Sequence, residues 1–281
     1  MKKIIGIDVG GTKIRGVLVD LNGKILEEKE IVTYKNHKKD LDSLIGLIER
    51  FNSKAVIGIG VGVPGSLDLK RESIIGFSNL PGWENFKLKD FLKNKFKKRV
   101  EIENDVNCVA LAEKKFGAGI KYKNFIVINI GTGLGGGIII DNKLYEGRGN
   151  AGEFGQGKFF GHGKNKSFED LVSTKALLMI ARRNGLSGDS FKILEEAKNG
   201  NKKAKKVYEE VGKSLGEGIS NLVFYFDPEI VLIGGGLMNA GEFLLGPARK
   251  NAGLQFGRNV KIKQVGLLKN GGAIGAASLL M

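Results

Sequence analysis

The sequence predicts an α/β fold made of two related halves, in which helices cover mixed sheets. Two sets of β-branched runs, within residues 4–32 and 125–145, each predict strands joined by tight turns. A Gly/Thr turn follows the first strand of both sets, and apolar residues at helical spacing follow each set. Because this similarity recurs at a large separation, we expect a duplicated core.

The first set comprises residues 4–9, 14–19 and 25–32, and Asn22-Gly23 is a hairpin signal between the last two. The second set comprises residues 125–130, 136–140 and 143–145. Helical spacing of apolar residues predicts helices over 41–51, 86–96, 106–116, 168–183 and 202–226. Residues 100–103 predict a strand before the third helix. The chain closes with strand 230–233, helix 238–250, strand 260–265 and an apolar helix over 272–280.

Composition narrows the classes of function. The 281 residues contain 45 Lys and Arg against 30 Asp and Glu, a net charge of +15 that would suit nucleic acid, a membrane surface or small anionic substrates. The densest basic stretch, residues 87–99, alternates with apolar residues at helical spacing, which indicates a helix with its lysines in water. No helix-turn-helix or zinc-finger pattern is present. We therefore predict that the protein binds neither nucleic acid nor membranes.

Cysteine usage and the start of the chain point to one compartment. A lone cysteine, Cys108, excludes an intramolecular disulfide framework and any multi-cysteine zinc site. No apolar run approaches the roughly 20 residues of a membrane span. The first residues interrupt any apolar stretch with an acid and glycines, unlike a signal peptide. We expect a cytoplasmic protein.

The segment Asp8-Val-Gly10-Gly11-Thr12-Lys13 is the first candidate phosphate site. Glycines let backbone amides approach an anion closely, Thr12 and Lys13 add a hydroxyl and a charge, and Asp8 could hold Mg²⁺ through water. The P-loop spacing is missing and a strand follows where a P-loop has a helix. An ordinary glycine hairpin is the alternative interpretation.

Two further glycine turns are candidates for the same ligand. Gly131-Thr132-Gly133 begins a match to G-x-G-x-x-G, but a dinucleotide fingerprint requires a following helix and residues 136–140 predict a strand. We interpret it as a second Gly/Thr turn related to the first. Gly235 and Gly236 follow a buried strand and could lie against an adenosine, although a close strand–helix turn is the simpler interpretation of that segment alone.

The segment Glu103-Asn104-Asp105-Val-Asn107 stands between a strand and a helix. Either Asn104 or Asp105 would serve as an N-cap. A carboxylate at such a junction is also well placed to accept a proton from a substrate hydroxyl, so Asp105 is the candidate catalytic base.

Taken together, these motifs resemble those of the ROK (repressor, ORF, kinase) family of sugar kinases, glucokinase-like members of the actin-like ATPase superfamily. Residues 7–13 and 131–137 resemble its two phosphate motifs, and residues 62–65 and 79–83 its sugar-side loops. Residues 103–107 resemble its catalytic segment. Residues 150–156 and 167–173 resemble the two stretches whose glutamates contact the sugar.

The resemblance implies a two-domain actin-like ATPase fold, of the duplicated ribonuclease H-like type, with mixed sheets and a cleft between the domains. It implies a small domain of residues 1–107 completed by the C-terminal helix within 268–281, and a large domain of 108–267. It implies ATP and Mg²⁺, a homodimer, and a hexose substrate. By the same resemblance the sugar-binding residues are Gly65, Asn79, Asn104, Asp105, Glu153 and Glu169.

One departure from the family pattern concerns zinc. Many members carry a structural zinc on a motif histidine and three cysteines. Here Gln156 stands at the histidine position, and Phe160, His162 and Ser167 fall where the cysteines would be. We therefore expect no zinc site, and Gln156 becomes a candidate donor to the sugar.

The predicted function is ATP-dependent transfer of a phosphoryl group to O6 of a hexose, most simply glucose. Kinases for fructose, mannose, allose, N-acetylglucosamine or N-acetylmannosamine are alternatives, as is polyphosphate as the donor. A sugar-responsive transcriptional regulator is disfavoured because the first phosphate strand begins at Ile4, which leaves no room for a helix-turn-helix. An actin-like assembly module would not need Asp105, Asn79, Glu153 and Glu169 together.

Overall fold

A computed structural model describes residues 1–76, 80–159, 166–255, 258–267 and 269–281. The chain forms two compact units. Unit 1 consists of Met1–Lys121, Gly137–Ala151 and Gly266–Met281, and unit 2 of Tyr122–Gly136 and Gly152–Val265. The predicted boundary between residues 107 and 108 falls inside a helix, Asp105–Phe116, whereas the compact units keep that helix whole.

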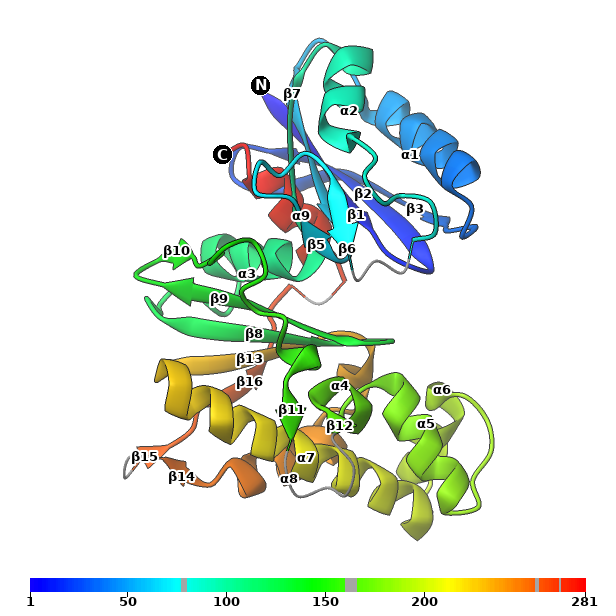
Figure 1. Cartoon of the computed structure of the whole chain (residues 1–281), viewed down its shortest axis with the longest axis vertical. Coiled ribbons are helices and arrows are strands. Elements are labelled where there is room, and N and C mark those ends of the chain that lie inside the picture. Colours follow the sequence, from blue (N-terminus) through cyan, green and yellow to red (C-terminus); the bar gives the residue numbers. More distant parts are fainter. Residues whose placement is uncertain (77–79, 160–165, 256–257, 268) are drawn as a thin grey trace. The chain divides into compact units, whose positions relative to one another are not determined.

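Unit 1 contains a five-stranded sheet, four helices and short accessory strands among its described residues (Figure 1). The sheet strands are β1 (Lys3–Val9), β2 (Lys13–Asp20), β3 (Ile25–Val32), β4 (Val56–Val63) and β7 (Arg99–Asn104). The helices are α1 (His37–Phe51), α2 (Leu88–Phe96), α3 (Asp105–Phe116) and α9 (Gly271–Ser278). The accessory strands are β5 (Ser66–Leu67), β6 (Ile74–Gly76) and β10 (Lys143–Leu144).

The strands of this sheet lie in the order β3-β2-β1-β4-β7. β1, β2 and β3 are antiparallel neighbours, whereas β4 is parallel to both β1 and β7. Alternate residues of β1 face opposite layers: Ile5 and Ile7 pack with α1 and α2, and Ile4 packs with α3 and α9. The sheet is thus covered by helices on both faces, as predicted for an α/β fold.

Helix α9 lies unusually close to the sheet and to α3. A Cβ atom on Gly60 of β4 would stand 1.8 Å from the carbonyl oxygen of Ala276, and one on Gly6 of β1 would stand 2.0 Å from that of Ala273. A Cβ on Gly275 would stand 1.7 Å from the carbonyl oxygen of Cys108 on α3. Only glycine permits these approaches, so the C-terminal helix is an integral layer of unit 1.

The second five-stranded sheet has the order β10-β9-β8-β13-β16, and its strand β9 passes from unit 2 into unit 1. Its remaining strands are β8 (Phe125–Ile130), β9 (Leu134–Ile140), β13 (Ile230–Gly234) and β16 (Ile262–Gln264). β13 is parallel to β8 and β16. Each sheet starts with three chain-consecutive strands and continues with two later ones in parallel, which confirms the predicted duplication.

The helices of unit 2 are α4 (Phe168–Leu171), α5 (Thr174–Arg183), α6 (Ser190–Lys198), α7 (Lys202–Phe226) and α8 (Glu242–Ala252). Single turns η1 (Phe154–Gln156) and η2 (Gly236–Ala240) and strands β11 (Lys158–Phe159), β12 (Lys166–Ser167), β14 (Leu254–Gln255) and β15 (Arg258–Asn259) complete it. The single helix predicted over 168–183 is wrong, because Ser173 caps a new helix: its Oγ accepts from the amide of Ala176 at 3.1 Å. Within the described ranges no helix combines the length and apolar character of a membrane span.

Candidate functional site

The first Gly/Thr turn joins β1 to β2 (Figure 1). The amide of Gly10 donates to the carbonyl of Lys13 at 2.9 Å, which closes the turn. Thr33, just beyond β3, holds it from the side: its hydroxyl donates to the Gly10 carbonyl at 2.8 Å and its amide to the Thr12 carbonyl at 3.0 Å. Hydrogen bonds within the turn and from Thr33 therefore stabilise its shape.

Glu30 on β3 forms ion pairs with two basic residues that follow this turn. The ammonium of Lys13 lies 2.5 Å from Glu30, and Arg15 pairs with the same carboxylate. Hydrogen bonds from Lys13 and Arg15 hold the pKa of Glu30 down at about 2. Glu30 stays ionised throughout the physiological range and orients both cations.

Asp8 is the second-last residue of β1, beside the turn. It is half-buried, and burial raises the pKa of its carboxyl to about 6, against a smaller lowering by Arg15. A Cβ on Gly272, at the start of α9, would lie 2.6 Å from Asp8 Oδ2, so the carboxylate occupies a recess that glycine alone leaves open. A cation held there would favour the ionised form of Asp8.

The start of α3 holds the predicted catalytic segment. Asn104 is the N-cap: its Oδ1 accepts from the amides of Val106 at 2.9 Å and Asn107 at 3.1 Å. Its Nδ2 donates to the carbonyl of Gly65 at 3.1 Å, which ties the segment to the predicted sugar-side loop. Asp105 is the first residue of the helix, and its Oδ1 accepts from the amide of Val106 at 2.9 Å.

A glycine on the sheet lets α3 approach closely. A Cβ on Gly62 of β4 would stand 3.2 Å from Cys108 Sγ and 3.5 Å from Asp105 Cα. Burial raises the pKa of the Cys108 thiol well above its usual range, with further contributions from Glu103, Asp8 and Asp105. Asp8 and Asp105 therefore both lie near enough to Cys108 for their charges to act on it, and Cys108 is a fully buried, protonated residue of α3.

The second Gly/Thr turn links β8 to β9. The predicted strand after it is confirmed, which excludes a dinucleotide fingerprint here. The amide of Gly131 donates to the carbonyl of Gly133 at 2.9 Å. Glu169 Oε2 accepts from the amide of Leu134 at 2.9 Å, and a Cβ on Gly133 would stand 2.5 Å from that oxygen. Glu169, predicted from the resemblance to contact a sugar, thus also shapes the second phosphate turn.

Glu153 and Glu169 lie close enough to interact. The pKa of Glu153 is raised by burial and by the charge of Glu169. Gln156 is exposed at the end of η1, and its backbone N–H donates to the backbone carbonyl of Glu153 at 3.2 Å. Unit 2 therefore brings two carboxylates together, with the exposed Gln156 three residues from Glu153 in the chain, and carboxylate and amide groups suit sugar hydroxyls.

The third glycine turn follows β13. Gly235 has φ +89°, and a Cβ there would stand 2.2 Å from the carbonyl oxygen of Ile130. Gly236 begins η2 and is exposed, with open space around its α-carbon. Glycine is required at position 235 because the backbone there passes close to Ile130 at the end of β8. At position 236 the absence of a side chain leaves the backbone accessible to solvent.

Of four other residues singled out in the sequence, three have no described position and one caps a helix. Asn79, Phe160 and His162 lie outside the described residues. Ser167 is the N-cap of α4 in a capping box with Asp170, so its hydroxyl serves the helix start. Among the residues with described positions, no group of three or more His, Cys, Asp or Glu could hold a metal ion.

Two carboxylates that hold backbone or neighbouring side chains were given no role from the sequence, although Glu103 lies within the predicted catalytic segment. Glu113 on α3 is fully buried and accepts from the amides of Ala118, Gly266 and Leu267 at 2.7–2.9 Å. Glu103 is also buried and accepts from Arg71, Asn104 and Asn107. An acidic residue on a predicted apolar helix face was the only signal for Glu113.

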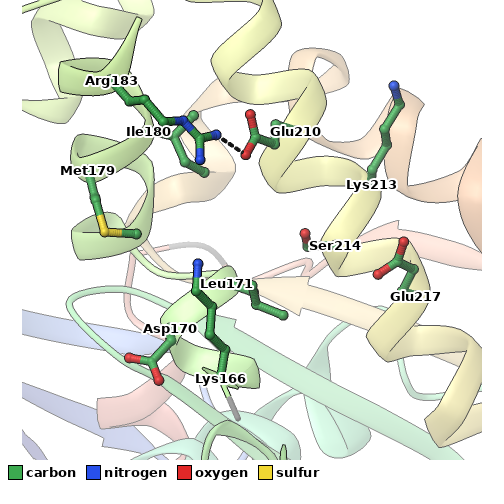
Figure 2. A pocket seen from close by; sticks show the side chains of 10 residues that line it. All are labelled: Lys166, Asp170, Leu171, Met179, Ile180, Arg183, Glu210, Lys213, Ser214 and Glu217. Atoms are coloured by element: carbon green, nitrogen blue, oxygen red, sulfur yellow. Dashed lines mark hydrogen bonds and ion pairs between the residues drawn. The ribbon is translucent and has the colours of Figure 1, made fainter. Parts of the chain in front are cut away.

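A cavity of about 320 Å³ lies in unit 2 between α4, α5 and α7 (Figure 2). Its lining residues are Lys166, Asp170, Leu171, Met179, Ile180, Arg183, Glu210, Lys213, Ser214 and Glu217. Arg183 and Glu210 form an ion pair across one end. Asp170 and Leu171 follow Glu169 on α4, but none of the ten lining residues belongs to the predicted site.

Comparison with known proteins links these features to one family. The model of the ROK family matches residues 4–281. A glucokinase of Thermotoga maritima is 32% identical over 99% of this chain and 97% of its own length. A xylose repressor of Caldicellulosiruptor bescii is 33% identical over 88% of this chain and 69% of its own length. The crystal structure of a ROK family glucokinase from Streptomyces griseus, in complex with glucose and AMPPNP, has a TM-score of 0.86 at 32% identity and covers 99% of this chain and 98% of that one.

Proposed function

The chain belongs to the ROK family, and we propose that it is an ATP-dependent hexose kinase that phosphorylates O6 of its sugar, with glucose as the favoured acceptor. The single observation that carries the proposal is the construction of the α3 start. There Asn104 takes over the capping of the helix, so Asp105 is not needed as the cap. Asp105 follows a strand of the same sheet whose first strand carries Asp8 and the phosphate turn.

In the proposed reaction Asp105 is the general base. As O6 of the sugar forms a bond to the γ-phosphorus, its proton passes to the Asp105 carboxylate. The bond from the γ-phosphorus to the bridging oxygen breaks, and ADP leaves with that oxygen. Such a transfer asks the protein mainly for positioning and for charges placed around the phosphoryl group.

The glycine turns are assigned to the triphosphate. We assign Gly10, Gly11, Thr12 and Lys13 in unit 1, and Gly131, Thr132 and Gly133 in unit 2, to phosphate contacts. Gly235 and Gly236 are assigned to the adenosine, because exposed backbone beside Gly236 lets a flat group approach. Rigid turns of this kind bind anions without reorganising.

Asp8 is assigned to Mg²⁺ held through water. A kinase Mg²⁺ needs only one or two protein carboxylates because phosphates and waters supply its other ligands, and the recess beside Gly272 fits a single carboxylate. Mg²⁺ supplies charge neutralisation during transfer. Asp8 contributes an ionised carboxylate, which its pKa of about 6 provides at pH 7 and above.

The sugar is assigned to Gly65, Asn79, Asn104, Asp105, Glu153, Gln156 and Glu169. The hydrogen bond between Asn104 and Gly65 supports the assignment of these two residues to one site. The proximity of Glu153 to Glu169 supports the assignment of that pair. Glucose is favoured because the glucokinases of T. maritima and S. griseus are each 32% identical to this chain over nearly its whole length. Other hexoses and N-acetylhexosamines are the competing acceptors, and polyphosphate is the competing donor.

The test is a product-coupled assay of the purified chain over a panel of hexoses and N-acetylhexosamines, with ATP or polyphosphate. Glucose with ATP and Mg²⁺ should have the highest kcat/KM. Asp105→Asn should lower kcat by about 100- to 10,000-fold, the usual contribution of a general base. Asp42→Asn, an exposed position on α1, is the matched control and should leave kcat unchanged. A fully active D105N enzyme would overturn the assignment of the base.

A second candidate function is a sugar-responsive regulator, favoured by the 33% identity to the C. bescii xylose repressor. A regulator would bind sugar and a specific DNA sequence without turnover. Sugar binding by calorimetry, with no phosphorylation of any sugar in the panel, would support the regulator over the kinase.

A further inference from the structure

A buried carboxylate lies directly behind the predicted catalytic segment. Glu103, the penultimate residue of β7, is 1% exposed. Its Oε1 accepts from Arg71 Nη1 at 2.5 Å, from the amide of Asn104 at 2.7 Å and from Asn107 Nδ2 at 3.0 Å. Two of these three donors belong to the N-cap and first turn of α3, on either side of Asp105.

Arg71 reaches Glu103 from a loop that is itself rigidly held. The amide of Arg71 donates to the carbonyl of Asp68 at 2.9 Å. Asp68 Oδ1 accepts from the amides of Glu72 at 2.6 Å and Ser73 at 3.0 Å. Arg71 has φ +53° at the turn of this loop. The base of its side chain is therefore fixed between β5 and β6.

The guanidinium of Arg71 bridges two carboxylates. Its Nη1 pairs with Glu103, and its Nη2 lies 3.0 Å from Glu146, which follows β10. The Arg71 side chain is 17% exposed, against 2% for Glu103 and 45% for Glu146. One planar, always-charged group thus connects the β5–β6 loop, the end of β7 and the segment after β10.

We propose that Arg71 is a positioning residue: it anchors Glu103, and Glu103 holds the first turn of α3 so that Asp105 meets the sugar hydroxyl in a fixed geometry. This inference rests on the proposed kinase function. Neither Arg71 nor Glu103 needs to contact the substrates. Their effect on the reaction passes through the backbone of Asn104 and the side chain of Asn107.

The ionisation of Glu103 makes the arrangement sensitive to pH. The pKa of Glu103 is raised to about 7: burial is the largest cause, Arg71 and the hydrogen bonds from Asn107 and Asn104 oppose it, and the charge of Glu146 adds to it. The other titratable groups close by are Asp105 and the Cys108 thiol, whose pKa is raised by burial and by Glu103. A carboxylate accepts from three donors, whereas a protonated carboxyl uses one oxygen as a donor. Loss of Arg71 should therefore raise the pH above which Glu103 can hold the α3 start.

The experiment measures kcat and KM of the kinase reaction from pH 6 to 9 for the wild type, Arg71→Met and Arg71→Lys. R71M should lower kcat at pH 7.5 by roughly 10- to 100-fold, the loss expected when a catalytic group is misplaced by about 1 Å. The KM for sugar should rise by a smaller factor. The acid limb of the kcat profile should move to higher pH in R71M. R71K, which keeps the charge, should recover part of the rate and move the limb less.

A double-mutant cycle tests whether Arg71 acts through Glu103. With Glu103→Gln already present, R71M should lower kcat by less than about threefold, because the neutral amide side chain of E103Q no longer needs the cation. Equal losses in both backgrounds would overturn the proposal, and so would an unshifted acid limb in R71M.

Lys89→Met is the matched control. Lys89 pairs at 2.9 Å with Glu101, two residues before Glu103 on the same strand, and both side chains are about one-quarter exposed. K89M should leave kcat and its pH profile unchanged. If R71M unfolds, the R71K profile and the E103Q profile, whose acid limb should lie at lower pH than that of the wild type because Glu103 no longer titrates, decide the question. A wild-type chain that phosphorylates no sugar would refute the proposed function, whereas an active wild type with a fully active R71M would refute the role of Arg71 alone.

Discussion

The docking of α9 on the unit 1 sheet should be intolerant of a single methyl group at Gly60. The added Cβ of Gly60→Ala would stand 1.8 Å from the carbonyl oxygen of Ala276 and 2.4 Å from its carbonyl carbon. Both atoms belong to backbone, so no rotamer change relieves the overlap. Ordinary Cβ contacts begin near 3.4 Å, so β4 and α9 must separate by roughly 1.6 Å.

A separation of this size is costly across a buried face. A gap of 0.5–1 Å already forfeits a quarter to a half of the dispersion attraction between facing atoms. The apolar atoms at risk belong to Ala273, Ile274 and Ala277, which pack with Ile4 and Val19 of the sheet. Overpacking usually costs about 1–3 kcal/mol, and a backbone clash lies at or above the upper end. We expect G60A to lower the free energy of unfolding by about 3 kcal/mol or more.

Urea unfolding followed by circular dichroism provides the measurement, with Gly46→Ala as the control. Gly46 is exposed within α1 and has no atom within 4 Å of an added Cβ. The same chemical change there should stabilise the protein by about 0.5–1 kcal/mol, because alanine loses less backbone entropy in a helix. If G60A unfolds at the wild-type urea concentration while G46A is stabilised, the close docking of α9 is refuted.

Two other predictions concern the phosphate turns. Burial raises the pKa of Asp8 from 3.8 to about 6, so the stability that its protonated form contributes is lost as the pH rises through about 6. Asp8→Asn should therefore raise the free energy of unfolding at pH 7.5 by about 2–3 kcal/mol. Loss of the carboxylate that holds Mg²⁺ through water should lower kcat by about 10- to 100-fold. Urea titrations at pH 4.5 and 7.5 check the sign of the stability change, and a less stable D8N at pH 7.5 would contradict it. Gly133→Ala should displace Glu169, whose Oε2 would lie 2.5 Å from the new Cβ, and free the Leu134 amide. We expect KM for ATP to rise about tenfold, the loss of roughly one charge-assisted hydrogen bond, with Gly246→Ala on α8 as the control, and an unchanged KM in G133A would count against the role of Glu169 in the turn.

Local patterns were sufficient for much of the fold. The strands 25–32 and 125–130 and the helix 202–226 have the predicted bounds, because β-branched runs and helical spacing are properties of contiguous residues. The glycine turns were also predictable, since each lies between two strands or at the end of one. Strand β4 (Val56–Val63) was not predicted, because its valines and isoleucines are separated by glycines that weaken the strand pattern.

Those glycines have a tertiary reason. Gly60 and Gly62 clear space for α9 and α3, and neither helix is a sequence neighbour of β4. The division of the chain into two compact units likewise depends on segments far apart in the sequence. Residues 137–151 and 266–281 belong to unit 1 together with residues 1–121. A boundary drawn from sequence had no means of assigning them.

For the candidate site, the sequence alone determined which residue types stand at the strand ends: Asp8 and the glycines after β1, Asn104 and Asp105 after β7, and the second Gly/Thr turn after β8. Their chemistry follows from neighbouring residues, so it could be predicted. Only the tertiary structure decided what holds them. Arg71 meets Glu103 across 32 residues of chain, and Glu169 meets Leu134 across 35. Such pairs leave no periodic trace in the sequence, because they depend on the path of the backbone between them.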